Sequence, residues 1–447
     1  MTEWETADLV QRDHAHLIHP LHYPDDHAEP LILVEGNGVM VKDLAGREYI
    51  DGLAGLWNVL VGHGRMELAE AAAKQMAELA YCSSYIGSSN VPAIELAERL
   101  SGLAYPDLRR TFFTTGGGEA NDSAFKTARY YWKRRGKPEK TKIISRLDSY
   151  HGVTLASMSA TGIHNYWTMF EPRVPGFVHI PPPYPYRFEG EKEGESIGAA
   201  AARMLEEAIE GEGPETVAAF IAEPVMGAGG VILPPDDYFQ RVRAICTEHE
   251  VLFIGDEVIT GFGRTGQQFG LHNWGVRPDL MVFAKGITSG YLPLGGLQVS
   301  DEIADVINTA SSSERWMHSY TYSAHPTCCA VALANLDIID GEGLVEQAAN
   351  RGVRLLEGLK TLYDLEVVGE VRGLGLMAAV ELVADRGTKE PGQIADKVRR
   401  AALDRGLFTR IRGEILLLAP PLIISDDEVD CLVSIVRDAI AAVAVGE

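Results

Sequence analysis

A lysine at the end of a buried strand is the first residue here whose position suggests chemistry. Leu280 to Ala284 form a short, continuous apolar run, which is typical of a strand covered on both faces, and Lys285 follows it directly. Its ammonium could remain in water while the stem packs on apolar atoms. Alternatively, burial lowers its pKa, and the amine can form a Schiff base. The position by itself favours the solvated arrangement.

A carboxylate at the end of another buried strand changes that balance. Val251 to Ile254 predict this strand, and Asp256 and Glu257 follow it. Ligands of open α/β sheets bind at the carboxyl ends of strands. Asp256 and Val258 are two residues apart, so in extended chain they point to one side. An acid beside an apolar side chain suits the pyridine ring of pyridoxal phosphate, because the acid keeps the ring nitrogen protonated. Helix capping and magnesium binding are alternatives for the acidic pair.

A glycine-rich loop is a third candidate element. Arg110 to Thr114 predict a strand, and a helix is expected from about Ala120 to Arg135. The loop between them contains Gly117 and Gly118, whose backbone N–H groups near a helix start would favour a phosphate. Three glycines in a plain turn are the alternative.

Together these motifs resemble the class III aminotransferases, the fold-type-I pyridoxal-phosphate enzymes that include the ω-transaminases. The sequence GDEVITGFGRTG, followed downstream by FAKG, carries the resemblance, which extends from about Leu17 to about Pro421. It implies that Lys285 holds pyridoxal 5′-phosphate, that Asp256 pairs with the ring nitrogen and that Val258 covers a ring face.

The resemblance also marks one departure in the phosphate loop. The family usually has SGSEA, whereas Gly116 and Gly118 replace both serines here. Backbone donors remain, but hydroxyl contacts to the phosphate are lost, so somewhat weaker phosphate binding is expected.

Further residues take their roles only from the resemblance. Tyr150 of a YHG motif would stack on the ring opposite Val258, and Glu223 would lie near the ring hydroxyl. Thr321, in HSYTYS, matches a threonine that reaches the phosphate of the neighbouring subunit. The implied substrate pocket contains Leu21, Tyr23, Trp57, Tyr85 and Tyr150, with Arg410 as the mobile arginine that binds the keto-acid carboxylate and Arg412 as its alternative. Without the resemblance, a core tryptophan, a loop tyrosine, a polar turn and a solvated arginine are the simpler interpretations.

The order of the predicted elements indicates the fold. Strands alternate with helices, which predicts parallel pairing with right-handed crossovers. We expect an α/β, fold-type-I transferase: a large domain with a mostly parallel sheet flanked by helices, and a smaller α+β domain. The expected boundaries are 1–59 for an N-terminal segment that contributes to the small domain and pocket entrance, 60–326 for the large domain and 327–447 for the small domain. The first 30 residues are expected to be irregular.

Composition excludes several classes of function. The net charge of −23 disfavours nucleic acid and anionic lipid as partners. No apolar run is long enough for a membrane span, and the polar N-terminus lacks a signal-peptide pattern, so a cytoplasmic protein is expected. The five cysteines form no CxxC pair, which suits a reducing compartment. No metal is expected, although five histidines crowd the N-terminus: His14, His16, His19, His22 and His27.

These observations predict an aminotransferase that acts by a ping-pong mechanism as a homodimer with shared active sites, with a tetramer as the alternative assembly. A primary amine or ω-amino acid would be the donor and a keto acid, with pyruvate expected, the acceptor. Taurine– or β-alanine–pyruvate aminotransferase is an alternative, as is an aminomutase or racemase of the same fold. A degenerate binding protein is disfavoured because Lys285 and Asp256 are both present.

Overall fold

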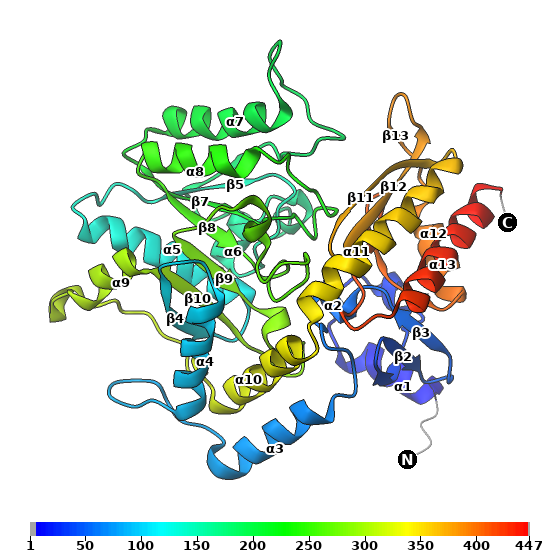
Figure 1. The fold of residues 1–447 in the computed structure, drawn as a ribbon, viewed down its shortest axis with the longest axis horizontal. Coiled ribbons are helices and arrows are strands. Elements are labelled where there is room, and N and C mark those ends of the chain that lie inside the picture. Colours follow the sequence, from blue (N-terminus) through cyan, green and yellow to red (C-terminus); the bar gives the residue numbers. More distant parts are fainter. Residues whose placement is uncertain (1–5, 446–447) are drawn as a thin grey trace.

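The computed structural model describes residues 6–445. Its larger part is built on a seven-stranded sheet with the order β4-β10-β9-β8-β7-β5-β6 (Figure 1). Among these strands only β10 runs antiparallel to its neighbours, so the α/β fold with a mostly parallel sheet is confirmed. The strands are β4 (Leu108–Thr114), β5 (Lys142–Arg146), β6 (Phe177–Ile180), β7 (Val217–Ala222), β8 (Leu252–Asp256), β9 (Leu280–Phe283) and β10 (Gly295–Ser300).

Helices cover both faces of this sheet, which explains the continuous apolar strands. Every residue of β7, β8 and β9 is buried. Phe220 and Phe253 point to one face and pack with α7 (Ile197–Glu212) and α8 (Tyr238–Glu248). Neighbouring residues on the same strands point to the other face, where they pack with α5 (Gly117–Arg134).

A second sheet forms the smaller part of the molecule, with the order β11-β12-β16-β15 and β13 paired to β12. Three helices lie beside it, as the yellow, orange and red ribbons of α11, α12 and α13 in Figure 1 show. The strands are β11 (Val368–Leu374), β12 (Met377–Asp385), β13 (Glu390–Pro391), β15 (Arg410–Arg412) and β16 (Ile415–Leu418); the helices are α11 (Leu344–Lys360), α12 (Ala395–Asp404) and α13 (Asp426–Ala444). Helix α10 (Pro326–Gly341) leads into this part from the larger one.

The N-terminal strands join the C-terminal part of the chain. A hairpin is formed by β2 (Met40–Asp43) and β3 (Glu48–Asp51), with β1 (Leu33–Asn37) on its outer side. Strand β3 pairs in parallel with β14 (Leu407–Phe408), so residues far apart in sequence share a sheet. Further α-helices are α2 (Ala54–Trp57), α3 (Met66–Leu79), α4 (Val91–Leu103), α6 (Leu155–Ala160) and α9 (Asp301–Asn308).

The expectation that the first 30 residues are irregular is wrong for residues 6–16, and residues 1–5 lie outside the described part of the chain. Residues Thr6–His16 form helix α1, because this stretch contains no glycine or proline that would interrupt the backbone hydrogen bonds. Pro20 follows shortly after its end. The histidine rings of this region stack, with His19 and His27 centroids 4.0 Å apart.

No helix within residues 6–445 has the length and apolar character needed to cross a membrane. No group of three or more histidine, cysteine, aspartate or glutamate side chains in the same residues is placed to hold a metal ion.

Candidate active site

Four neighbouring parallel strands bring the predicted site residues together. Lys285 lies just beyond β9, Asp256 ends β8, Glu223 follows β7, and Tyr150 lies in the loop after β5. These strands are adjacent in the sheet and run in one direction, so their carboxyl ends share one edge. The Cα atoms of Asp256 and Val282 are register partners, which places Lys285 next to the aspartate.

A cavity of about 500 Å³ opens at this edge, a size typical of small-molecule sites. Seven of the predicted residues line it: Gly117, Gly118, Tyr150, Glu223, Asp256, Val258 and Lys285. The cavity therefore contains the predicted phosphate loop, the predicted ring partners and the lysine.

Lys285 occupies a strained turn at the floor of this cavity. Its φ of 48° is left-handed, a conformation that costs a non-glycine residue about 1 to 2 kcal/mol. Buried Asn335 of α10 stabilises the turn by donating hydrogen bonds to the carbonyls of Gly286 (2.9 Å) and Ile287 (3.0 Å). Burial lowers the pKa of Lys285 to about 8, against the opposing charges of Asp256 and Glu223. A fraction of the amine is therefore neutral and nucleophilic near neutral pH.

Three donors orient the carboxylate of Asp256. Oδ2 accepts from His151 Nδ1 (2.7 Å) and Asn121 Nδ2 (2.9 Å), and Oδ1 accepts from the backbone N–H of Val258 (3.1 Å). The assumption of extended chain from Asp256 to Val258 is wrong, because the chain turns at the end of β8. Both side chains nevertheless line the cavity.

Sequence reasoning missed the roles of His151 and Asn121. His151 belongs to the quoted YHG motif, so the motif was a usable signal, whereas Asn121, in the second turn of α5, had none. Asn121 also donates to the His151 carbonyl (2.7 Å), so it positions both His151 and Asp256.

Glu257 does not share the site with its neighbour. Its carboxylate accepts from the backbone N–H groups of Gly270 (2.7 Å) and Leu271 (3.0 Å), and from the hydroxyls of Tyr105 and Thr260. The magnesium alternative for the acidic pair needs two carboxylates facing one ion, and this geometry does not provide them.

Glu223 fixes the loop that carries Tyr150. Its two carboxylate oxygens accept from the N–H groups of Tyr150 (2.9 Å) and Gly227 (3.0 Å). Burial raises the pKa of this carboxyl. Burial is also the main cause that raises the pKa of the Tyr150 phenol to about 12, so the ring stays neutral. Tyr166 lies beside it, with ring centroids 5.5 Å apart.

The predicted phosphate loop is the start of α5, which begins at Gly117 rather than near Ala120. The first N–H groups of a helix have no partner within it, so those of Gly117 and Gly118 are available to an anion. A side chain at Gly117 would meet both methyl groups of Val258 at 3.0 Å. At Gly118 the nearest atoms to an added Cβ lie 3.6 Å away, so a side chain fits.

Replacing Gly118 by serine is expected to tighten cofactor binding by about three- to tenfold, because the site has space for the hydroxyl that the family usually supplies there. Titration of the cofactor-free protein with pyridoxal phosphate, followed by absorbance, measures this constant. Gly117→Ser is the matched control, and the crowding at Val258 should weaken binding instead. Weaker binding in Gly118→Ser would contradict the prediction.

Several predicted residues lie outside the cavity lining. Leu21, Tyr23, Tyr85, Thr321 and Arg410 are exposed. The Tyr85 hydroxyl donates to Ser319 Oγ (2.8 Å), and the Thr321 carbonyl accepts from Tyr81 (2.8 Å), so these two segments lie together. Within a single chain, none of these five predicted residues lines the cavity that contains the predicted ring-binding groups.

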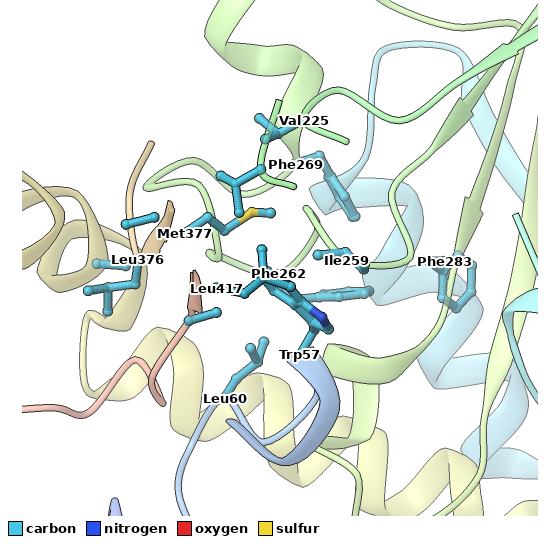
Figure 2. Packing of buried hydrophobic residues seen from close by; sticks show 14 of the residues in the cluster. Trp57, Leu60, Val225, Ile259, Phe262, Phe269, Phe283, Leu376, Met377 and Leu417 are labelled. Carbon is cyan, nitrogen blue, oxygen red and sulfur yellow. The ribbon is translucent and has the colours of Figure 1, made fainter. Parts of the chain in front are cut away.

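Trp57 is a core residue in this structure, with 3% of its surface exposed. Figure 2 shows its ring among Phe262, Ile259 and Leu417, where side chains of the two sheets meet. The next residue, Asn58, lines the cavity instead. The substrate role of Trp57 stays a prediction.

The residues present fit pyridoxal phosphate. A buried amine of lowered pKa, an oriented carboxylate and free helix N–H groups line one cavity. Tyr150 and Val258 supply the aromatic and apolar surfaces that a flat ring needs.

Comparisons with known proteins identify the family of the chain. Residues 23–440 match the family model described as aminotransferase class-III. The chain is 41% identical over 412 residues to a putrescine–pyruvate aminotransferase from Pseudomonas aeruginosa, covering 91% of this chain and 89% of the relative. It is 40% identical over 442 residues to a diaminobutyrate–2-oxoglutarate transaminase from Halomonas elongata, covering 96% and 94%.

Solved structures give the same result. A thermostable (S)-enantioselective ω-transaminase from Thermomicrobium roseum is 50% identical to this chain. The two match with a TM-score of 0.95, covering 98% of this chain and 99% of the other.

Proposed function

The chain belongs to the class III aminotransferases, pyridoxal-phosphate enzymes that move amino groups from small amines to keto acids, and we propose that its acceptor is pyruvate and its donor a primary amine or ω-amino acid. The buried amine of Lys285, placed beside the oriented Asp256 by the register of β8 and β9, is the observation that carries the catalytic part of this proposal.

The proposed roles follow from the position of each side chain. Bound pyridoxal phosphate supplies an electron-withdrawing ring that stabilises negative charge on the reacting carbon. Asp256, oriented by His151 and Asn121, would pair with the ring nitrogen. Tyr150 and Val258 would hold the ring faces, and the first N–H groups of α5 would hold the phosphate.

Lys285 would hold the cofactor covalently and then move protons. When it is free, its Nζ would accept the proton that leaves the amine-bearing carbon of the substrate and would donate it again in the later proton transfer. Proton transfer is efficient when the pKa of the group is close to the working pH, and the pKa of about 8 meets this condition.

Arg410 supports a keto acid as acceptor. Among the described residues its side chain has no hydrogen-bond or ion-pair partner, whereas Arg412 Nη2 bonds Asp148 Oδ1 at 3.3 Å. The putrescine relative is named for pyruvate and the diaminobutyrate relative for 2-oxoglutarate, at nearly the same identity. Sequence identity to these two relatives therefore does not indicate which keto acid is the acceptor. A single arginine without a partner in the described part of the chain, Arg410, favours an acceptor with a single carboxylate.

Absorbance spectroscopy tests this function directly. The yellow colour of the purified holoenzyme should change on adding an amine donor and return on adding pyruvate. A panel of 1-phenylethylamine, putrescine, β-alanine and taurine would identify the donor class. No change with any amine would indicate a binding protein, and isomerisation of one substrate without a keto acid would indicate an aminomutase or racemase.

A homodimer with shared active sites is part of the proposal. The hydrogen-bonded segments around Tyr85 and Thr321 expose large apolar side chains, including Ile86 (93% exposed), Met317 (77%) and Tyr322 (58%). Contiguous exposed apolar surface is typical of subunit interfaces. We further propose the division into residues 1–59, 60–326 and 327–447, which the pairing of β3 with β14 supports.

Thr321→Ala is expected to weaken cofactor retention by about tenfold if its hydroxyl reaches the partner's phosphate site. Retention is measured by the rate at which dialysed holoenzyme loses its absorbance. Sedimentation at assay concentration should show a dimer, and fully active monomers would contradict the shared site.

A further inference from the structure

Two arginine side chains leave one face of β15, near the loop that carries Tyr150. Arg410 and Arg412 are two residues apart on a strand, so their side chains leave the same face. Burial raises the pKa of the Tyr166 phenol, and the positive charges of Arg412 and Arg410 partly offset this rise. The ring of Tyr166 lies against Tyr150, which lines the cavity. Both guanidinium groups therefore lie on the side of the cavity where Tyr166 packs against Tyr150.

Among the described residues, only Arg412 of these two arginines has an ion-pair partner. Its partner, Asp148, lies two residues before Tyr150 on the loop after β5, and side chains 264 positions apart thus form an ion pair. The loop holds Asp148 in place, since its N–H donates to the Gly162 carbonyl (3.1 Å). Gly229 also contacts it so closely that an added Cβ would lie 2.3 Å from the Asp148 carbonyl oxygen.

We propose that Asp148, by pairing with Arg412, restricts the acceptor to 2-oxo acids with a single carboxylate. This inference rests on the function proposed above. Arg410 can receive one carboxylate. The second carboxylate of a dicarboxylic acid would find the other guanidinium occupied and would meet the like charge of Asp148. Discrimination by such repulsion is a common source of specificity.

The spacing suits a five-carbon dicarboxylic acid once Asp148 is neutral. Residues two apart on a strand are separated by about 6.5 to 7 Å, which is within reach of two carboxylates on one short chain. Removing the charge of Asp148 should therefore free a second binding group rather than only remove a repulsive one.

Asp148→Asn is the direct test. Asp148 has a left-handed φ of 60°, which asparagine tolerates well, so the variant loses the charge without new backbone strain. The kcat/KM ratio of 2-oxoglutarate to pyruvate, measured with one amine donor, should rise about tenfold or more. Inhibition by glutarate relative to propionate, two unreactive acids, should increase in parallel.

Asp107→Asn is a matched control. Asp107 also has a left-handed φ, 71°, and an arginine partner, Arg277. Its side chain is 46% exposed, compared with 45% for Asp148. It precedes β4 and so lies at the sheet edge opposite the cavity. This variant should leave the acceptor ratio unchanged. The double variant Asp148→Asn/Arg412→Gln should keep only the part of the gain that comes from removing the like charge, because the freed guanidinium is absent.

An unchanged ratio in Asp148→Asn, or an equal rise in Asp107→Asn, would overturn the inference. Wild-type enzyme that uses 2-oxoglutarate better than pyruvate would also overturn it, while leaving the aminotransferase activity intact. Wild-type enzyme that transfers amino groups to neither acid would refute the proposed acceptor and this inference together.

Discussion

Replacing Lys285 by alanine is expected to lower turnover with every amine and acceptor by at least about 10⁴-fold. The residue has two proposed roles, covalent attachment and proton transfer, and proton transfer by a positioned group typically contributes about 10²- to 10⁴-fold alone. Alanine leaves the left-handed turn no more strained than lysine does, and Asn335 still holds it. Single-turnover kinetics with the cofactor-loaded variant measure the loss.

Borohydride reduction of the wild-type holoenzyme, followed by peptide mass mapping, should place the pyridoxyl group on Lys285. Lys140 is an internal control, because burial also lowers its pKa to about 8. Its Nζ is already bonded to backbone carbonyls, among them those of Pro214 (2.8 Å) and Glu250 (2.8 Å). A label on Lys140, or on any lysine other than Lys285, would refute the assignment.

Arg410→Ala is expected to raise the KM for pyruvate about 30- to 1000-fold. The lost interaction joins two charges in a partly desolvated site, which is typically worth about 2 to 4 kcal/mol. The half-reaction with 1-phenylethylamine involves no carboxylate, so its single-turnover rate should stay within about tenfold of wild type. The two half-reactions, measured separately, must therefore respond differently.

Arg412→Ala is the comparison for this experiment. Because Asp148 already occupies Arg412, its loss should change the KM for pyruvate much less. Equal damage to both half-reactions in Arg410→Ala would mean that Arg410 only supports the structure. A selective loss of pyruvate binding in Arg412→Ala instead would move the role to that residue.

The amino-acid sequence by itself determined the elements and the main chemical groups. Strands buried on both faces must be continuously apolar, so β7, β8 and β9 were recognisable from local composition. Ligands of such sheets bind at the carboxyl ends of the strands, so the polar residues that follow β8 and β9 were candidate site residues. Asp256 and Lys285 do line one cavity. Local patterns were misleading where the chain bends or lacks a buried face, as after Asp256 and in α1.

Only the tertiary structure decided which groups act on those candidates. The partners of Asp256 are Asn121, 135 positions away, and His151, 105 positions away, while Asn335 reaches the Lys285 turn from α10. The choice between Arg410 and Arg412 depends on Asp148, which lies in another sheet's loop. Hydrogen bonds and ion pairs of this kind depend on distances between segments, and no local spacing or composition encodes them.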